Sequence, residues 1–153
     1  MYMKAPDTLP LYWVNRLGFA ARKELTTRFE DNGLAATAED WASLRFLASG
    51  PQPTTALSAA TLRDRTTVSR LADKLVGKGW VQRTPDAKDR RRLNLELTEE
   101  GRAALSQMSA LADQLIAQVS VGISAEEQRV ATSVLQRMFE NLSEASLKGS
   151  DDV

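Results

Sequence analysis

The 153-residue sequence carries 20 basic and 20 acidic side chains, is 42% hydrophobic, and contains neither Cys nor His. The lack of Cys excludes a disulfide framework and a thiol-based redox switch. The lack of His removes the commonest transition-metal ligand and the usual general base. The length favours one domain with a substantial core. No signal peptide and no run of about 18 apolar residues is present, so we expect a cytoplasmic protein without a membrane span.

The first fifty residues predict two amphipathic helices. In the first, over residues 8–31, apolar residues recur at three- or four-residue steps: Val14, Leu17, Ala21, Leu25 and Phe29. Asn32 and Gly33 favour the left-handed conformation that ends a helix. Thr37 is the expected N-cap of the second helix, with Asp40 three residues later. The Gly-Pro-Gln-Pro segment at 50–53 ends this second helix.

Two further helices are predicted over residues 55–76. The first is short and is expected to bury Leu57 and Ala60. The second follows Asp64, a favourable N-cap, and its inward stripe is Val68, Leu71, Ala72 and Leu75. Its opposite face is polar: Thr66, Thr67, Ser69, Arg70, Asp73 and Lys74. Such a face is often simply solvated, but a short helix before it and a basic hairpin after it favour a recognition surface.

Residues 62–92 concentrate the positive charge of the chain. They contain ten Lys or Arg and four Asp, which gives 10 − 4 = +6, so the remaining residues carry −6 in this neutral chain. This asymmetry indicates a polyanionic partner. Strands are predicted over 80–83 and 93–97, where leucines alternate with Asn94 and Glu96. Between them, turn residues and a run of three Arg at 90–92 have the length and charge of a wing that reaches DNA.

Two long helices complete the chain. Thr98 is a favourable N-cap for the helix over 99–121, and Ser124 with Glu127 forms a capping box for the helix over 123–147. Their apolar stripes are Leu105, Met108, Ala112, Leu115 and Val119, then Val130, Val134, Leu135, Met138, Phe139 and Leu142. Such stripes usually form intrachain core. Because little else in the chain could cover them here, we expect these helices to pair with a second copy about a two-fold axis.

The predicted fold is mainly α, an α+β winged helix with six helices and a two-stranded β-wing. Within a single chain spanning 1–153, residues 37–98 form the winged helix-turn-helix DNA-binding region. The terminal helices, 8–33 and 123–147 with part of 99–121, form the dimerisation domain.

The chain resembles the MarR family of bacterial regulators, named for multiple antibiotic resistance. The residues that carry the resemblance are Arg65-Thr-Thr-Val-Ser-Arg-Leu-Ala-Asp-Lys-Leu75, then Lys78-Gly-Trp-Val-Gln-Arg83. The most specific segment is Asp89-Arg-Arg-Arg-Leu-Asn-Leu-Glu-Leu-Thr-Glu-Glu-Gly101, which is similar to the family's Asp-x-Arg wing followed by Leu-Thr-x-x-Gly.

The resemblance implies a homodimeric, sequence-specific DNA-binding regulator, most often a repressor released by a small ligand. The helix at 65–76 would enter the major groove, with Arg70 suited to a bidentate contact with guanine. Arg91 matches the wing Arg that enters the minor groove, and Asp89 matches the residue that braces the wing through an ion pair. Arg90 and Arg92 are expected to contact phosphate or to pair with acids. The expected contacts from the recognition helix are Arg65, Thr66, Thr67, Ser69, Arg70 and Lys74. A dimer would bind a pseudo-palindromic operator with half-sites about 10–10.5 base pairs apart.

The resemblance also implies a small effector, often aromatic and anionic, bound between the dimerisation helices and the winged helix. Trp13, Arg16, Trp41 and Arg45 combine flat apolar surface with positive charge, although both Trp residues have the alternative of being core aromatics. Trp13, Asn15, Asp64 and a wing Arg also resemble the set found in the urate-responsive branch of the family. Asp64 has the competing role of a helix N-cap.

Other classes of function have weaker support in the sequence. No nucleophile motif, Gly-rich phosphate loop or metal signature is present, so we expect no enzyme activity, no metal and no cofactor. A winged helix that contacts only proteins, or one that binds DNA without sequence preference, remains an alternative. Steep salt dependence would argue against the first, and a preference for an operator over random DNA would argue against the second.

Overall fold

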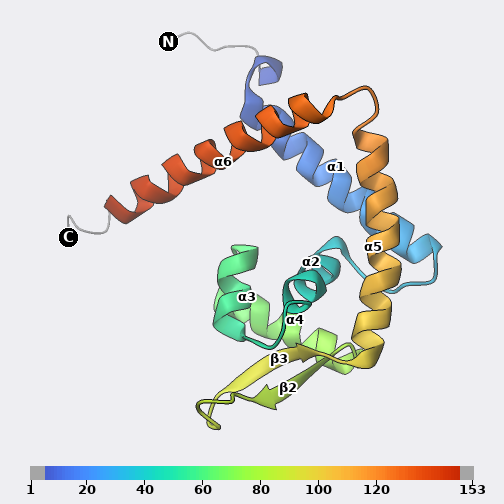
Figure 1. Cartoon of the computed structure of the whole chain (residues 1–153), viewed down its shortest axis with the longest axis vertical. Coiled ribbons are helices and arrows are strands. Elements are labelled where there is room, and N and C mark those ends of the chain that lie inside the picture. The colour runs from blue at the N-terminus through green and yellow to red at the C-terminus, as the bar shows by residue number, and fades with distance from the viewer. Residues whose placement is uncertain (1–5, 149–153) are drawn as a thin grey trace. The chain divides into compact units, whose positions relative to one another are not determined.

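The computed structural model describes residues 6–148, with side chains described over 7–143, and contains six α-helices and three short strands in that range (Figure 1). The helices are α1 Pro10–Asp31, α2 Ala38–Leu47, α3 Thr54–Thr61, α4 Arg65–Gly77, α5 Glu99–Val119 and α6 Ala125–Lys148. The strands are β1 Gln52–Pro53, β2 Val81–Pro85 and β3 Leu93–Leu97, and a 3-10 turn, Pro6–Thr8, precedes α1. The predicted mainly α winged-helix fold is confirmed.

The chain divides into two compact units, and the division falls inside α5, between Leu115 and Ile116. The first unit holds α1 to α4, the sheet and most of α5. The second holds the last turn of α5 and α6. No helix in the described part of the chain is both long and apolar enough to cross a membrane.

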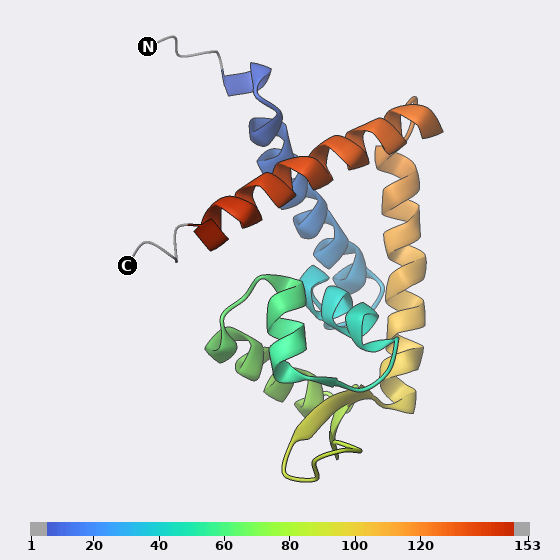
Figure 2. The same cartoon turned by 60° about the vertical axis from the view of Figure 1, so that its left-hand side comes forward.

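The core of the first unit lies between the helices of the winged region and the sheet, which Figures 1 and 2 show grouped together. α4 buries the stripe expected from its sequence, since Val68, Ala72 and Leu75 are fully enclosed and Leu71 is nearly so. α1 buries Leu25 and Phe29 in this core, and Ala21 packs partly buried against it. Val14 and Leu17, in the same apolar stripe, are exposed in the single chain.

The sheet has three antiparallel strands in the order β1-β3-β2, one strand more than the sequence predicted. In the wing, Val81 pairs with Leu97 and Pro85 with Leu93. The additional strand is β1, in which Gln52 lies opposite Leu95. A two-residue strand is too short to show an alternating pattern, and Pro53 fits there because an edge strand tolerates a missing N–H donor.

Two burial predictions were wrong. Ala60 is exposed, because the eight-residue α3 is anchored by Leu57 alone and Ala60 lies in its last turn, just before the chain reverses. That reversal passes through Leu62, which has a left-handed φ of 54°. The alternation of β3 also fails at its start, where Leu93 is 53% exposed and Asn94 only 9%. Asn94 turns inward because its amide donates a hydrogen bond to Asp86 in the wing loop.

The predicted helix starts are confirmed. Thr37 and Asp40 form a reciprocal capping box, with backbone-to-side-chain distances of 3.1 and 2.9 Å. Asp64 caps α4. The Thr98 hydroxyl accepts a hydrogen bond from the N–H of Gly101, and Ser124 caps α6 together with Glu127. Each cap satisfies backbone N–H groups that the first helical turn leaves without partners.

A close backbone contact joins the start of α5 to the start of β2. The carbonyl of Trp80 accepts a hydrogen bond from Thr98 N at 3.0 Å, and the Thr98 hydroxyl donates to the Gly79 carbonyl at 2.5 Å. Gly101 then packs directly on the Trp80 carbonyl. A Cβ at Gly101 would lie 2.8 Å from the Trp80 carbonyl carbon and closer still to its oxygen. Only glycine therefore allows α5 to begin at this place.

We predict that Gly101→Ala and Gly77→Ala change stability in opposite directions. A methyl group at Gly101 collides with backbone that cannot move alone, so the free energy of unfolding should fall by about 3 kcal/mol. Gly77 ends α4 with nothing within 4 Å of an added Cβ, and Ala there should stabilise by about 0.5–1 kcal/mol. Urea denaturation followed by circular dichroism measures both. Equal effects of the two substitutions would contradict the close contact.

Candidate nucleic-acid interface

The recognition helix α4 begins with a rigid cap. Asp64 accepts hydrogen bonds from Thr67 N and from the Thr67 hydroxyl, both at 2.8 Å. These bonds, led by that from the Thr67 backbone, favour the ionised carboxylate and lower the pKa of Asp64 below its ordinary 3.8. The hydroxyl of Thr67 is therefore already engaged. The side chains of Arg65, Thr66, Ser69 and Arg70 are exposed on the outer face of α4.

The wing loop between β2 and β3 is organised by Asp86. One carboxylate oxygen accepts hydrogen bonds from the backbone N–H groups of Lys88 at 2.8 Å and Asp89 at 3.0 Å, and the other accepts from the Asn94 amide at 3.0 Å. The backbone N–H of Asp86 donates to the Arg92 carbonyl at 2.8 Å, which closes the loop. The bond from Lys88 N, followed by that from Asn94, lowers the pKa of Asp86 below 3.8.

Asp89, the residue expected to brace the wing, has a lesser part in these bonds. It accepts a hydrogen bond from Arg91 N at 3.1 Å, and its second oxygen lies 3.8 Å from Arg92 Nε in an exposed pair. Sequence reasoning missed the role of Asp86. The available signal was the Thr84-Pro85-Asp86 turn, because an Asp after Pro readily bonds to backbone N–H groups two and three residues on.

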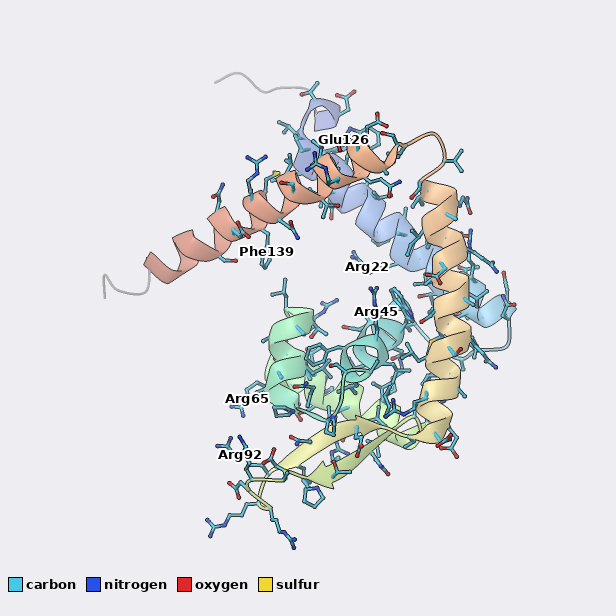
Figure 3. All side chains as sticks on the ribbon, viewed as in Figure 1. Arg22, Arg45, Arg65, Arg92, Glu126 and Phe139 are labelled. Carbon is cyan, nitrogen blue, oxygen red and sulfur yellow. The ribbon has the colours of Figure 1, made fainter. Side chains whose placement is uncertain are left out.

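The ten cations of the basic segment fall into two groups of five. Arg63, Lys74, Lys78, Arg83 and Arg92 lie within 4 Å of carboxylates, at distances between 2.5 and 3.8 Å. In the part of the chain that is described, the other five are exposed and have no ion pair: Arg65, Arg70, Lys88, Arg90 and Arg91. Figure 3 shows Arg65 of α4 and Arg92 of the wing extending toward the same side of the winged region. Lys88 was not foreseen as a contact.

The predicted effector residues lie in three separate places. Trp13, Asn15 and Arg16 line a depression of about 600 Å³ along α1, together with Leu17, Phe19 and Ala20. Trp41 and Arg45 lie on α2, where the guanidinium stands 5.3 Å from the indole centroid. The Trp41 indole N–H donates to Ser109 of α5 at 3.2 Å. Asp64 is the cap of α4, and over residues 7–143 neither it nor the α2 pair lines the α1 depression.

One further cation lies near these residues. Arg22 of α1 and Arg45 of α2 point into the space between their helices (Figure 3). Neither has an ion pair with any described residue. Nothing in the sequence distinguishes Arg22 from other surface cations, and its guanidinium lies beside Gly18 of the same helix.

A helix-turn-helix followed by an antiparallel wing, with unpaired cations on both, defines a winged-helix DNA-binding protein. Residues 33–92 match the model of the MarR family. Similar solved structures include a probable transcriptional regulator from Pseudomonas aeruginosa, at 29% identity and TM-score 0.68, covering 82% of this chain and 96% of that one. This match bears out the resemblance to the MarR family that the residues of α4 and the wing indicated.

Two other solved structures have the same fold. One is the MepR–DNA complex of S. aureus, at 21% identity and TM-score 0.80, covering 90% of this chain and 99% of that one. The other is CouR from Rhodococcus jostii RHA1 bound to p-coumaroyl-CoA, at 21% identity and TM-score 0.73, covering 94% and 95%.

We predict that Asp86→Ala disorganises the wing more than Asp89→Ala does. The first substitution leaves the N–H groups of Lys88 and Asp89 without their acceptor, whereas the second removes one backbone bond and a long ion pair. Amide hydrogen exchange at Lys88 and Asp89 should accelerate in Asp86→Ala alone. Unchanged exchange at both amides in that variant would show that another interaction shapes the loop.

Proposed function

We propose that this protein is a homodimeric, sequence-specific repressor that binds a pseudo-palindromic operator and is released by a small aromatic anion. The observation that carries the proposal is the set of five unpaired cations on α4 and the wing. In this proposal α4 enters the major groove, where Arg70 contacts a guanine and Thr66, Thr67 and Ser69 approach base edges or phosphates. Arg65 and Arg90 contact phosphates, and Arg91 enters the minor groove.

Dimerisation is supported by apolar surface that the single chain leaves open. In the first unit α1 exposes Leu11, Trp13, Val14, Leu17 and Phe19. In the second unit Ile116, Val119, Val121, Ile123, Val130, Leu135 and Phe139 are between 43% and 79% exposed. Apolar patches of this extent are rare on monomers, and a second copy of the same helices would cover them about a two-fold axis. The two recognition helices would then meet half-sites about 10–10.5 base pairs apart.

DNA binding is tested by fluorescence anisotropy with the intergenic DNA upstream of the protein's own gene and with a scrambled duplex, across a salt series. We expect nanomolar, selective binding with two protomers per duplex. A plot of the logarithm of the association constant against the logarithm of salt concentration should have a slope of about −0.9 for each phosphate neutralised. Equal, weak binding to both duplexes would instead indicate a non-specific DNA-binding module. Binding to neither duplex would favour a winged helix that contacts only proteins.

Arg70→Ala should reduce discrimination more than overall affinity. Loss of a bidentate contact with guanine costs about 1–3 kcal/mol on the operator, roughly a 5- to 150-fold fall in affinity, and much less on scrambled DNA. Lys23→Gln is the control for loss of one positive charge, because Lys23 lies exposed on α1, outside the winged helix. An equal loss of affinity for both duplexes would show that Arg70 contacts phosphate and not a base.

An aromatic anion has two candidate sites, and two substitutions distinguish them. The depression on α1 offers Trp13 and Arg16, whereas α2 offers the exposed Arg45 beside the Trp41 ring. Using benzoate and urate as probes, we expect quenching of Trp fluorescence and release of operator DNA. If Trp13→Phe alone binds the probe about tenfold more weakly, the anion lies on α1. If Arg45→Gln alone does so, the anion lies beside Trp41. Asp64→Asn tests the urate set separately. No binding of either probe would contradict an aromatic-anion effector.

A further inference from the structure

The first turn of α2 carries two adjacent carboxylates, Glu39 and Asp40, and both face cations of the basic segment. The Asp40 side chain is completely shielded from solvent. One of its oxygens accepts the N–H of Thr37 at 2.9 Å in the capping box. Lys74 Nζ lies 2.8 Å from both Asp40 oxygens, and Lys78 Nζ lies 3.7 Å from Oδ2.

The cations come from both ends of the recognition helix. Lys74 lies in the last turn of α4 and Lys78 is its C-cap, while Arg63 precedes its N-cap. Lys78 also donates to the Ala35 carbonyl and stands 4.5 Å from the Trp80 ring centroid. Glu39 Oε1 lies 3.2 Å from Arg63 Nε, and this oxygen is shielded from solvent without accepting a hydrogen bond. The pair is thus an electrostatic contact. One turn of α2 therefore holds α4 at both ends.

Burial makes the Asp40 contacts obligatory. A carboxylate removed from water is strongly destabilising unless cations and hydrogen-bond donors replace its hydration, and removal of one partner leaves an uncompensated charge. To reach a DNA phosphate, Lys74 would have to leave Asp40. Although its side chain is 42% exposed, its ammonium lies against Asp40.

We propose that Asp40 is a positioning residue that orients the recognition helix through Lys74 and Lys78, and that Lys74 belongs to this clamp and not to the phosphate contacts. The proposal rests on the DNA-binding function proposed above. In it, Arg70 and Thr66 meet the major groove at an angle set by the buried ion pair between Asp40 and Lys74. Operator affinity then depends on a carboxylate that never approaches DNA.

The salt dependence of binding separates a clamp from a phosphate contact. Lys74→Met keeps an apolar stem of similar length and removes the charge. If Lys74 is part of the clamp, operator affinity falls about tenfold or more while the log–log salt slope stays that of the wild type. Asp40→Asn, which retains an acceptor for Thr37 N, gives a similar fall. The double variant is no weaker than either single variant, because both remove the same interaction.

The opposite results would overturn the clamp. A phosphate contact at Lys74 makes the slope shallower by about 0.9, weakens operator and scrambled DNA alike, and leaves Asp40→Asn binding as the wild type does. Arg90→Gln, which removes an exposed and unpaired wing cation, is the positive control for a change of slope. Lys23→Gln on α1 is the negative control.

Unfolding experiments keep the clamp testable independently of DNA. Urea denaturation of the two single variants and the double variant forms a thermodynamic cycle, in which coupled residues give non-additive losses and independent residues give additive ones. Additive losses would overturn the clamp. If wild-type protein shows no selective DNA binding, the proposed function falls, and this cycle alone still decides whether Asp40 and Lys74 act together. If Asp40→Asn is too unstable to bind DNA, the salt slope of Lys74→Met alone decides between a clamp and a phosphate contact.

Discussion

The winged helix is organised around one carboxylate that folding removes from water. Asp40 caps the start of α2 through the capping box and also contacts Lys74 of α4 and Lys78 at its C-cap. One side chain thus fixes both a helix end and the packing of two helices. The same turn is fixed to α1, where the Ala38 N–H donates to Thr26, and to α5, where Trp41 donates to Ser109. Buried ion pairs often add little net stability compared with apolar packing, and their effect here is to specify one arrangement of helices.

Features that depend on a few neighbouring residues could be predicted from the sequence. The caps at Thr37, Asp64 and Ser124 each join a side chain to the backbone N–H three residues later, a spacing that the sequence itself contains. The buried stripe of α4 and its exposed opposite face follow from helical periodicity in the same way. The net charge of residues 62–92 was likewise visible in the sequence, and with it the class of partner.

Features that depend on distant parts of the chain could not be predicted. Lys74 looked like any cation on a polar helix face, and only the fold brings it against a carboxylate 34 residues away. β1 exists because β3 offers it an edge, not because two residues favour extended backbone. The burial of Asn94 and Ala60 also differed from the expected pattern. Asn94 turns inward because it bonds to Asp86 of the wing loop, and Ala60 lies too far from the core to be buried. Charge composition indicated a polyanionic partner, whereas packing decided which cations remain without an ion pair.

The hydrogen bonds of Asp86 also bear on how quickly the wing can engage a duplex. All of them lie inside the hairpin, to Lys88, Asp89 and Asn94, and the Asp86 N–H to Arg92 closes the loop without help from any ligand. Fixing one backbone residue costs about 1–2 kcal/mol of conformational entropy. For this loop the loss is incurred during folding, so it does not weaken association. In the proposed function the wing would approach a minor groove as a preformed arm, and encounters would not wait for the loop to order.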